Sequence, residues 1–114
     1  MDIEIINKPI DKKYLTEVAE KRFGDMVKVV VDIEQDIMAI GGELHADEEQ
    51  VLLEQGSKQE NLWGINLYPE KTGNDFIEFD SMINIRPRQN NRSRGVLDKD
   101  IQKKIIKIVE KLIK

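Results

Sequence analysis

The chain has 114 residues, a net charge of −4 and no cysteine. This length suits one hydrophobic core, so we expect residues 1–114 to form a single domain. The lack of cysteine excludes disulfides, thiolate zinc sites and cysteine nucleophiles. The acidic balance is atypical of a protein that coats nucleic acid, although a local basic patch is compatible with it.

The sequence carries no signal for membrane insertion or secretion. No apolar run reaches the length of a membrane span. Residues 1–10 lack the basic region and the long apolar region of a signal peptide. We therefore predict a cytoplasmic protein with no membrane partner.

Three segments with different periodicities open the chain. Residues 1–7 are rich in isoleucine and stop before a proline, which predicts a short edge strand. Residues 12–23 place apolar side chains at helical spacing between an aspartate N-cap and a glycine stop, which predicts an amphipathic helix. Residues 26–34 alternate valines with charged side chains, which predicts a strand.

The middle of the chain predicts two further strands around a short helix. Residues 37–46 resume an alternating pattern, and the pair Gly41 and Gly42 predicts a bulge within that strand. Residues 47–55 begin with an acidic cluster, which is typical of a helix start. Residues 62–68 alternate again and precede turn residues, so they predict the first strand of a hairpin.

The last third predicts a returning strand, a loop and a helix. Residues 76–86 alternate as a strand, residues 87–95 form an arginine-rich loop, and residues 98–114 have a wide apolar seam at helical spacing. Together the elements predict an α+β fold. We expect a mostly antiparallel sheet of about five strands, with two long helices on one face and one short helix.

Polar side chains gather on the sheet face that these helices leave open. Carboxylates at alternate positions of a strand point the same way and could share a divalent cation, with a histidine as a further ligand or a general base. Glu78, Asp80 and His45 therefore suggest a metal-assisted hydrolase as one hypothesis. An antiparallel sheet also normally leaves one face in water, so solvation alone accounts for polar residues there. The predicted face comprises Glu43, His45, Asn66, Tyr68, Glu78, Asp80, Asn84 and Arg86.

Four of the five arginines lie between residues 86 and 94. Guanidinium groups bind phosphate and carboxylate bidentately, and a helix start follows the loop. The stretch predicts a site for an anionic ligand, either a phosphate-bearing small molecule or a nucleic-acid segment. The alternative is internal ion pairing, with Asp98 and Asp100 among the available carboxylates. The candidate ligand-binding residues are Arg86, Arg88, Arg92, Ser93, Arg94 and Asn84.

Common catalytic templates do not occur in the sequence. It contains no glycine-rich phosphate loop, no paired-histidine zinc helix and no serine-hydrolase elbow. Catalytic residues and a cofactor therefore stay unassigned. A third hypothesis is a protein–protein interaction module that forms a homodimer or binds a partner through a sheet edge or the last helix.

Three stretches of the sequence are distinctive: MAIGGELHADEEQVLLEQGSKQENLWGINLYP, IEFDSMINIRP and NRSRGVLDKDIQKKI. They resemble a family of small prokaryotic proteins that is described only as a domain of unknown function. The resemblance extends over nearly the whole chain and implies a stand-alone domain of about this length. It implies no catalytic residue, cofactor or partner.

Overall fold

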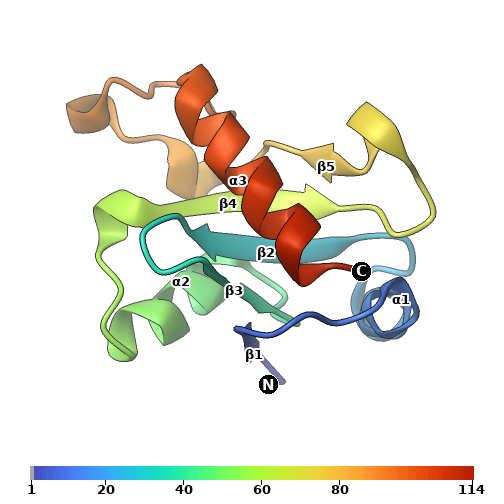
Figure 1. Ribbon diagram of the computed structural model, residues 1–114. Helices are drawn as coiled ribbons and strands as arrows, with labels where there is room; N and C mark the ends of the chain where they lie inside the picture. The colour runs from blue at the N-terminus through green and yellow to red at the C-terminus, as the bar shows by residue number, and fades with distance from the viewer. Residues whose placement is uncertain (1) are drawn as a thin grey trace.

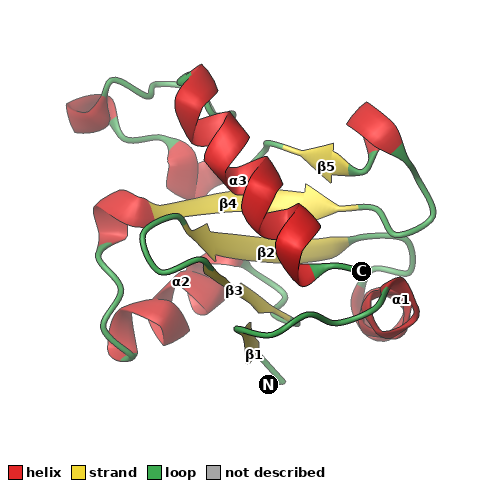
Figure 2. Ribbon diagram, viewed as in Figure 1, coloured by secondary structure: helices red, strands yellow, loops and turns green. Residues whose placement is uncertain are grey.

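The computed structural model describes residues 2–114, in which helices cover both faces of a central sheet (Figures 1 and 2). The strands are β1 (Glu4–Ile6), β2 (Val27–Asp32), β3 (Ile37–Ile40), β4 (Leu62–Leu67) and β5 (Ile77–Glu78). The α-helices are α1 (Lys12–Arg22), α2 (His45–Glu54) and α3 (Lys99–Leu112). Neighbouring strands pair antiparallel in the order β1-β3-β2-β4-β5. The predicted α+β class is confirmed, and so is the edge strand at the N-terminus, apart from Met1, which lies outside the described residues.

The pleat of the central strands divides the core into two apolar clusters. Successive side chains of a strand point to opposite faces of the sheet, so one strand can contribute to both clusters. Val29 and Val31 pack beneath α1 and α3, whereas Val30 between them packs beneath α2. The predicted pair of long helices on one face is thus confirmed as α1 and α3. The opposite face is not left open to water, because α2 and Ile83 cover part of it.

The predicted strand over residues 37–46 is too long. It ends at Ile40, and a helix begins at His45. Gly41 adopts a positive φ of 95°, and a Cβ there would lie 2.3 Å from the carbonyl oxygen of Asp2, so only glycine fits this close approach. The Gly42 N–H then bonds to the Glu48 carboxylate at 2.9 Å. The glycine pair therefore turns the chain into α2 and moves His45 from a strand onto a helix.

The predicted strand over residues 76–86 is also too long, since β5 contains only Ile77 and Glu78. Asn84 explains why the strand stops. Its side-chain amide accepts a hydrogen bond from Gly64 N at 2.8 Å and donates one to Gly64 O at 2.9 Å. These are backbone groups at the edge of β4 that a longer β5 would have used. Ile83 consequently packs against the α2 cluster, and the face that it was predicted to share with Ile77 does not form.

We expect Asn84→Ala to lower the free energy of unfolding by about 2–4 kcal/mol, because it leaves the buried N–H and C=O of Gly64 without partners. Urea unfolding measures the change. Asn74→Ala, at an exposed position, serves as the control and should change stability by about 0.5 kcal/mol or less. Equal effects of the two substitutions would contradict the role given to Asn84.

Glu48 places a carboxyl group in the interior beneath α2, where its exposed fraction is 0%. Oε2 accepts the Gly42 hydrogen bond, whereas Oε1 has no hydrogen-bond partner within residues 2–114. Burial raises the pKa of Glu48 well above its ordinary value, and the Gly42 hydrogen bond opposes this shift. The folded state therefore favours the neutral acid.

We expect the stability contributed by this group to fall as pH rises. The unfolded chain loses the Glu48 proton near its ordinary pKa of 4.5, whereas the folded protein holds it to higher pH. The contribution is thus complete below about pH 4.5 and is lost as pH rises through the folded pKa. Glu48→Gln keeps an acceptor for Gly42 and cannot ionise, so it should gain stability relative to wild type over the pH range above about 4.5. Urea unfolding curves that shift equally for both proteins over this range would contradict the assignment.

Candidate functional site

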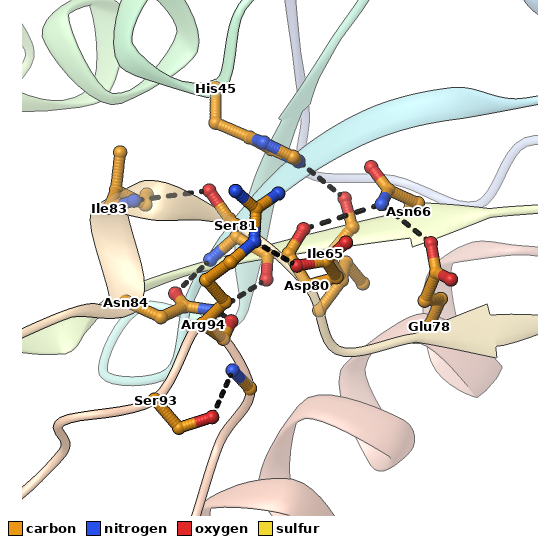
Figure 3. A network of polar contacts seen from close by, with 12 residues as sticks. His45, Ile65, Asn66, Glu78, Asp80, Ser81, Ile83, Asn84, Ser93 and Arg94 are labelled. Atoms are coloured by element: carbon orange, nitrogen blue, oxygen red, sulfur yellow. Dashed lines mark hydrogen bonds and ion pairs between the residues drawn. The ribbon is translucent and has the colours of Figure 1, made fainter.

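Polar side chains converge at the start of α2, beside β4 and the segment that follows β5 (Figure 3). Asn66 on β4 donates from Nδ2 to Glu78 Oε1 at 2.9 Å and to the backbone oxygen of Asp80 at 3.3 Å. Tyr68 donates its hydroxyl to the same Glu78 oxygen at 3.0 Å. The network thereby fixes the chain just before Ser81 and links the edge of the sheet to the loop beyond it.

His45, the first residue of α2, lies beside this network with 7% of its surface exposed. Its Nε2 is 2.8 Å from the Ile65 carbonyl oxygen. A carbonyl oxygen can only accept, so Nε2 carries the proton of this bond. Burial lowers the pKa of His45, which favours the neutral ring. In a neutral imidazole with a proton on Nε2, Nδ1 is a hydrogen-bond acceptor.

Arg94 and Asp80 form the ion pair of the site. Arg94 donates from Nε to Asp80 Oδ1 at 2.6 Å, and this bond lowers the pKa of the Asp80 carboxyl. No hydrogen-bond partner occupies the two Nη groups of Arg94 within the described chain, and Figure 3 shows them on the side toward His45. Asp80 therefore orients the guanidinium while leaving its outer donors available.

His45 and Arg94 line a pocket of about 180 Å³ between the start of α2 and the loop after β5. Lys28, from the neighbouring strand β2, adds a second cationic side chain. The N-cap of α2 is Leu44, which provides no side-chain hydrogen bond, so the N–H groups of His45 and Ala46 lack a side-chain cap, whereas the Asp47 N–H bonds to Leu44 O at 3.1 Å. Leu44 and Met82 are 58% and 65% exposed and form an apolar rim. The complete lining is Lys28, Leu44, His45, Ala46, Ser81, Met82, Ile83 and Arg94.

A larger hollow between α1 and β1, of about 320 Å³, offers less chemistry. Its Tyr14 hydroxyl is already bonded to Glu4. Its Arg22 donates to Gly41 O at 2.9 Å and pairs with Glu43 at 3.7 Å. Tyr14 and Arg22 are therefore already engaged there, whereas Arg94 in the pocket at α2 keeps unpaired donors.

Arg86 is separated from the pocket and serves the interior. Its Nη groups donate to the backbone oxygens of Gln59 and, at 2.6 Å, Leu62. The guanidinium carbon lies 4.2 Å from the centre of the Trp63 ring, which is a cation–π distance. Arg86 thus joins the start of β4 to the arginine-rich loop.

Arg88 and Arg92 lie exposed on the same loop. Neither forms an ion pair within residues 2–114, and the predicted pairing with Asp98 or Asp100 does not occur there. Asp98 instead caps α3 by accepting the Asp100 N–H at 2.8 Å. Of the two readings of the arginines, internal ion pairing therefore applies to Arg94 alone.

The neutral residues of the loop act as its scaffold. Ser93 Oγ accepts the Gly95 N–H at 2.9 Å. Asn91, which is not among the predicted ligand-binding residues, donates from Nδ2 to the backbone oxygens of Asn84, Ser93 and Gly95 and accepts the Leu97 N–H. An asparagine in a polar loop is too common a signal to have identified this role.

The residues of the hydrolase hypothesis lie near one another but face different partners. Glu78 binds Asn66 and Tyr68, Asp80 binds Arg94, and His45 binds the backbone. Within residues 2–114, no three histidine, cysteine, aspartate or glutamate side chains group in a way that could hold a metal ion. Glu43 of the predicted polar face lies apart and pairs with Arg22.

Sequence interpretation missed the residues that complete the pocket, chiefly Lys28, Ser81 and Met82. Lys28 had a usable signal, because it is a charged residue in a valine-rich strand and lies on the face opposite Val29. Ser81 and Met82 had none, since their place depends on β5 ending early. The pocket therefore became visible only with the fold.

The comparison with protein families gives one match. The model of the family described as "Protein of unknown function (DUF5674)" matches residues 4–112. The chain belongs to the DUF5674 family. No curated protein and no solved structure matches it. The family match confirms the resemblance seen in the sequence over nearly the whole chain, and DUF5674 assigns no activity to the pocket.

In the part of the chain that the structure describes, no helix has the length and apolar character needed to cross a bilayer.

We expect Arg86→Lys to destabilise the DUF5674 fold by about 1–3 kcal/mol, because an ammonium group cannot reproduce the forked bonds to two carbonyl oxygens or the stacking on Trp63. Thermal or urea unfolding measures the loss. Arg88→Lys makes the same exchange at an exposed position and should leave stability nearly unchanged. Comparable losses in both variants would contradict an internal role for Arg86.

Proposed function

We propose that this protein is a binding module for a small anionic ligand, and that the pocket at the start of α2 receives it. The observation that carries the proposal is the Arg94 guanidinium, which Asp80 holds through Nε while both Nη groups stay unpaired. A guanidinium oriented in this way matches the two oxygens of a phosphate or carboxylate. Of the arginines in the loop, Arg94 is the one that this proposal retains, together with pocket residues from other elements.

The surroundings of Arg94 add to its attraction for an anion. Lys28 contributes a second positive charge to the pocket lining. The start of α2 lacks a side-chain cap, so the N–H groups of its first two residues and the positive end of the helix dipole favour an anion there. Lys28 and Arg94 are the charged side chains of the pocket lining, and the nearby carboxylates of Asp80 and Glu78 offset part of their positive charge.

The size of the pocket sets the size of the ligand. Pockets for drug-sized molecules usually measure about 300–1,000 Å³. This pocket, at about 180 Å³, suits a small oxyanion or the anionic end of a larger molecule. Leu44 and Met82 at the rim offer an apolar surface to any such larger group.

Two other hypotheses have less support. A metal-assisted hydrolase needs Glu78, Asp80 and His45 to face one ion, and each of them has another partner. An interaction module that uses a sheet edge has only the two residues of β5 on one side and the three of β1 on the other. Nucleic-acid binding through Arg88 and Arg92 stays a prediction for the exposed loop.

We expect Arg94→Gln to raise the dissociation constant for inorganic phosphate at least tenfold, about 1.4 kcal/mol, because the forked donors are lost. An NMR titration that follows the backbone amides of His45 and Ala46 measures the affinity. Lys103→Gln, an exposed residue of α3, removes the same charge and should change the affinity less than twofold.

The double variant Arg88→Gln/Arg92→Gln separates the pocket from the loop. If phosphate binds in the pocket, this variant keeps most of the affinity. If its loss equals or exceeds that of Arg94→Gln, the ligand binds the exposed loop and the pocket proposal fails.

A further inference from the structure

The donors and acceptors of the pocket are unevenly distributed. Arg94 and Lys28 supply N–H donors for the oxygens of an anion. His45 is different, because its Nε2 proton is engaged by the Ile65 carbonyl oxygen at 2.8 Å. The ring nitrogen left for a ligand is Nδ1, and in this tautomer Nδ1 can only accept.

An acceptor on the wall of an anion pocket discriminates between anions. An oxygen atom without a proton would bring its lone pairs against those of Nδ1, and both groups would stay unsatisfied. A hydroxyl group of the ligand would instead donate to Nδ1. Selectivity of this kind is strong where polar groups are buried, because the wrong ligand leaves them unpaired.

We infer that the pocket selects an oxyanion that retains a hydroxyl group, with hydrogen phosphate as the simplest case, and that His45 Nδ1 accepts the hydrogen bond of that hydroxyl. The inference rests on the proposed function and specifies its ligand class. Arg94 and Lys28 bind the charged oxygens, and His45 recognises the hydroxyl group by accepting its hydrogen bond. Sulfate has the same shape and carries no proton in neutral solution, so it is the anion that this arrangement disfavours.

Neighbouring groups hold the state of His45, and the Asn66 side chain is one of them, because its hydrogen bond raises the pKa of the ring against the larger effect of burial. The Ile65 carbonyl on β4 fixes the proton on Nε2, and the charge of Lys28 on β2 disfavours a second proton. Asp80 acts in the opposite direction, but its carboxylate is committed to Arg94. The acceptor at Nδ1 is therefore a property of the fold and is present before a ligand arrives.

Competition between phosphate and sulfate tests the inference. At about pH 8 hydrogen phosphate and sulfate are both dianions, so a difference between them cannot come from net charge. With ionic strength held constant, we expect the wild-type protein to bind phosphate at least tenfold more tightly than sulfate. Equal affinities would overturn the inference and leave the proposed function intact. Failure to bind either anion would overturn both.

A substitution at His45 locates the selectivity. The His45→Gln substitution removes the Nδ1 acceptor, and the new side-chain amide can still donate to the Ile65 carbonyl oxygen. The phosphate-to-sulfate ratio of affinities should fall to within about twofold of one, whereas Arg94→Gln should weaken both anions together. A ratio that stays above tenfold in His45→Gln would overturn the role of Nδ1.

Imidazole nitrogen-15 NMR provides a readout that does not depend on a variant. His45 is the single histidine of the sequence, so its two ring nitrogens can be assigned directly. The ligand-free protein should show a proton on Nε2 and none on Nδ1. Phosphate should shift the Nδ1 resonance toward hydrogen-bonded values and sulfate should not; a proton on Nδ1 in the free protein would overturn the inference.

Discussion

The pairing of the Asn84 side chain with the backbone of Gly64 is the interaction on which the candidate site depends. Asn84 gives β4 the two hydrogen bonds that another strand residue would have given. It also donates to the Arg94 carbonyl oxygen at 2.9 Å. The Asn84 side chain thus ends the sheet at this edge. It also links the backbone of Arg94 to β4. Gly64 is part of the same constraint, because a Cβ there would lie 2.5 Å from that of Ser81.

Most polar groups of the site are already hydrogen-bonded to one another or to the backbone, and few of their donors and acceptors stay free. Asp80 spends its charge on Arg94, Glu78 accepts from two neighbours, and His45 donates to the sheet. The residues that keep free hydrogen-bonding groups, Arg94 and His45, both line the pocket at the start of α2. Preorganisation of this kind lowers the entropic cost of binding, because the side chains are already held before a ligand arrives.

The sequence predicted the features that periodicity controls and missed those that side chains impose on the backbone. The valine alternation of β2 and the wide apolar seam of α3 placed both elements correctly. Two strands were drawn too long, since nothing in an alternating pattern reveals that Gly41 must turn or that Asn84 will replace a strand partner. Most members of the polar set were identified, yet Arg86 proved internal, and the pocket also includes Lys28 of β2, which is far from the other lining residues in the sequence. Residues that meet in the fold but come from separate elements show no fixed spacing in the sequence.

The arginine-rich loop has a natural division at the backbone pair between Arg86 and Asn91, whose N–H and C=O groups bond to each other in both directions. Residues 87–90 form an excursion beyond this closure, with Asn90 at a positive φ of 59° and every residue exposed. The closure isolates the tip mechanically from Arg94. The tip is therefore where relatives can change length and composition while the pocket keeps its shape.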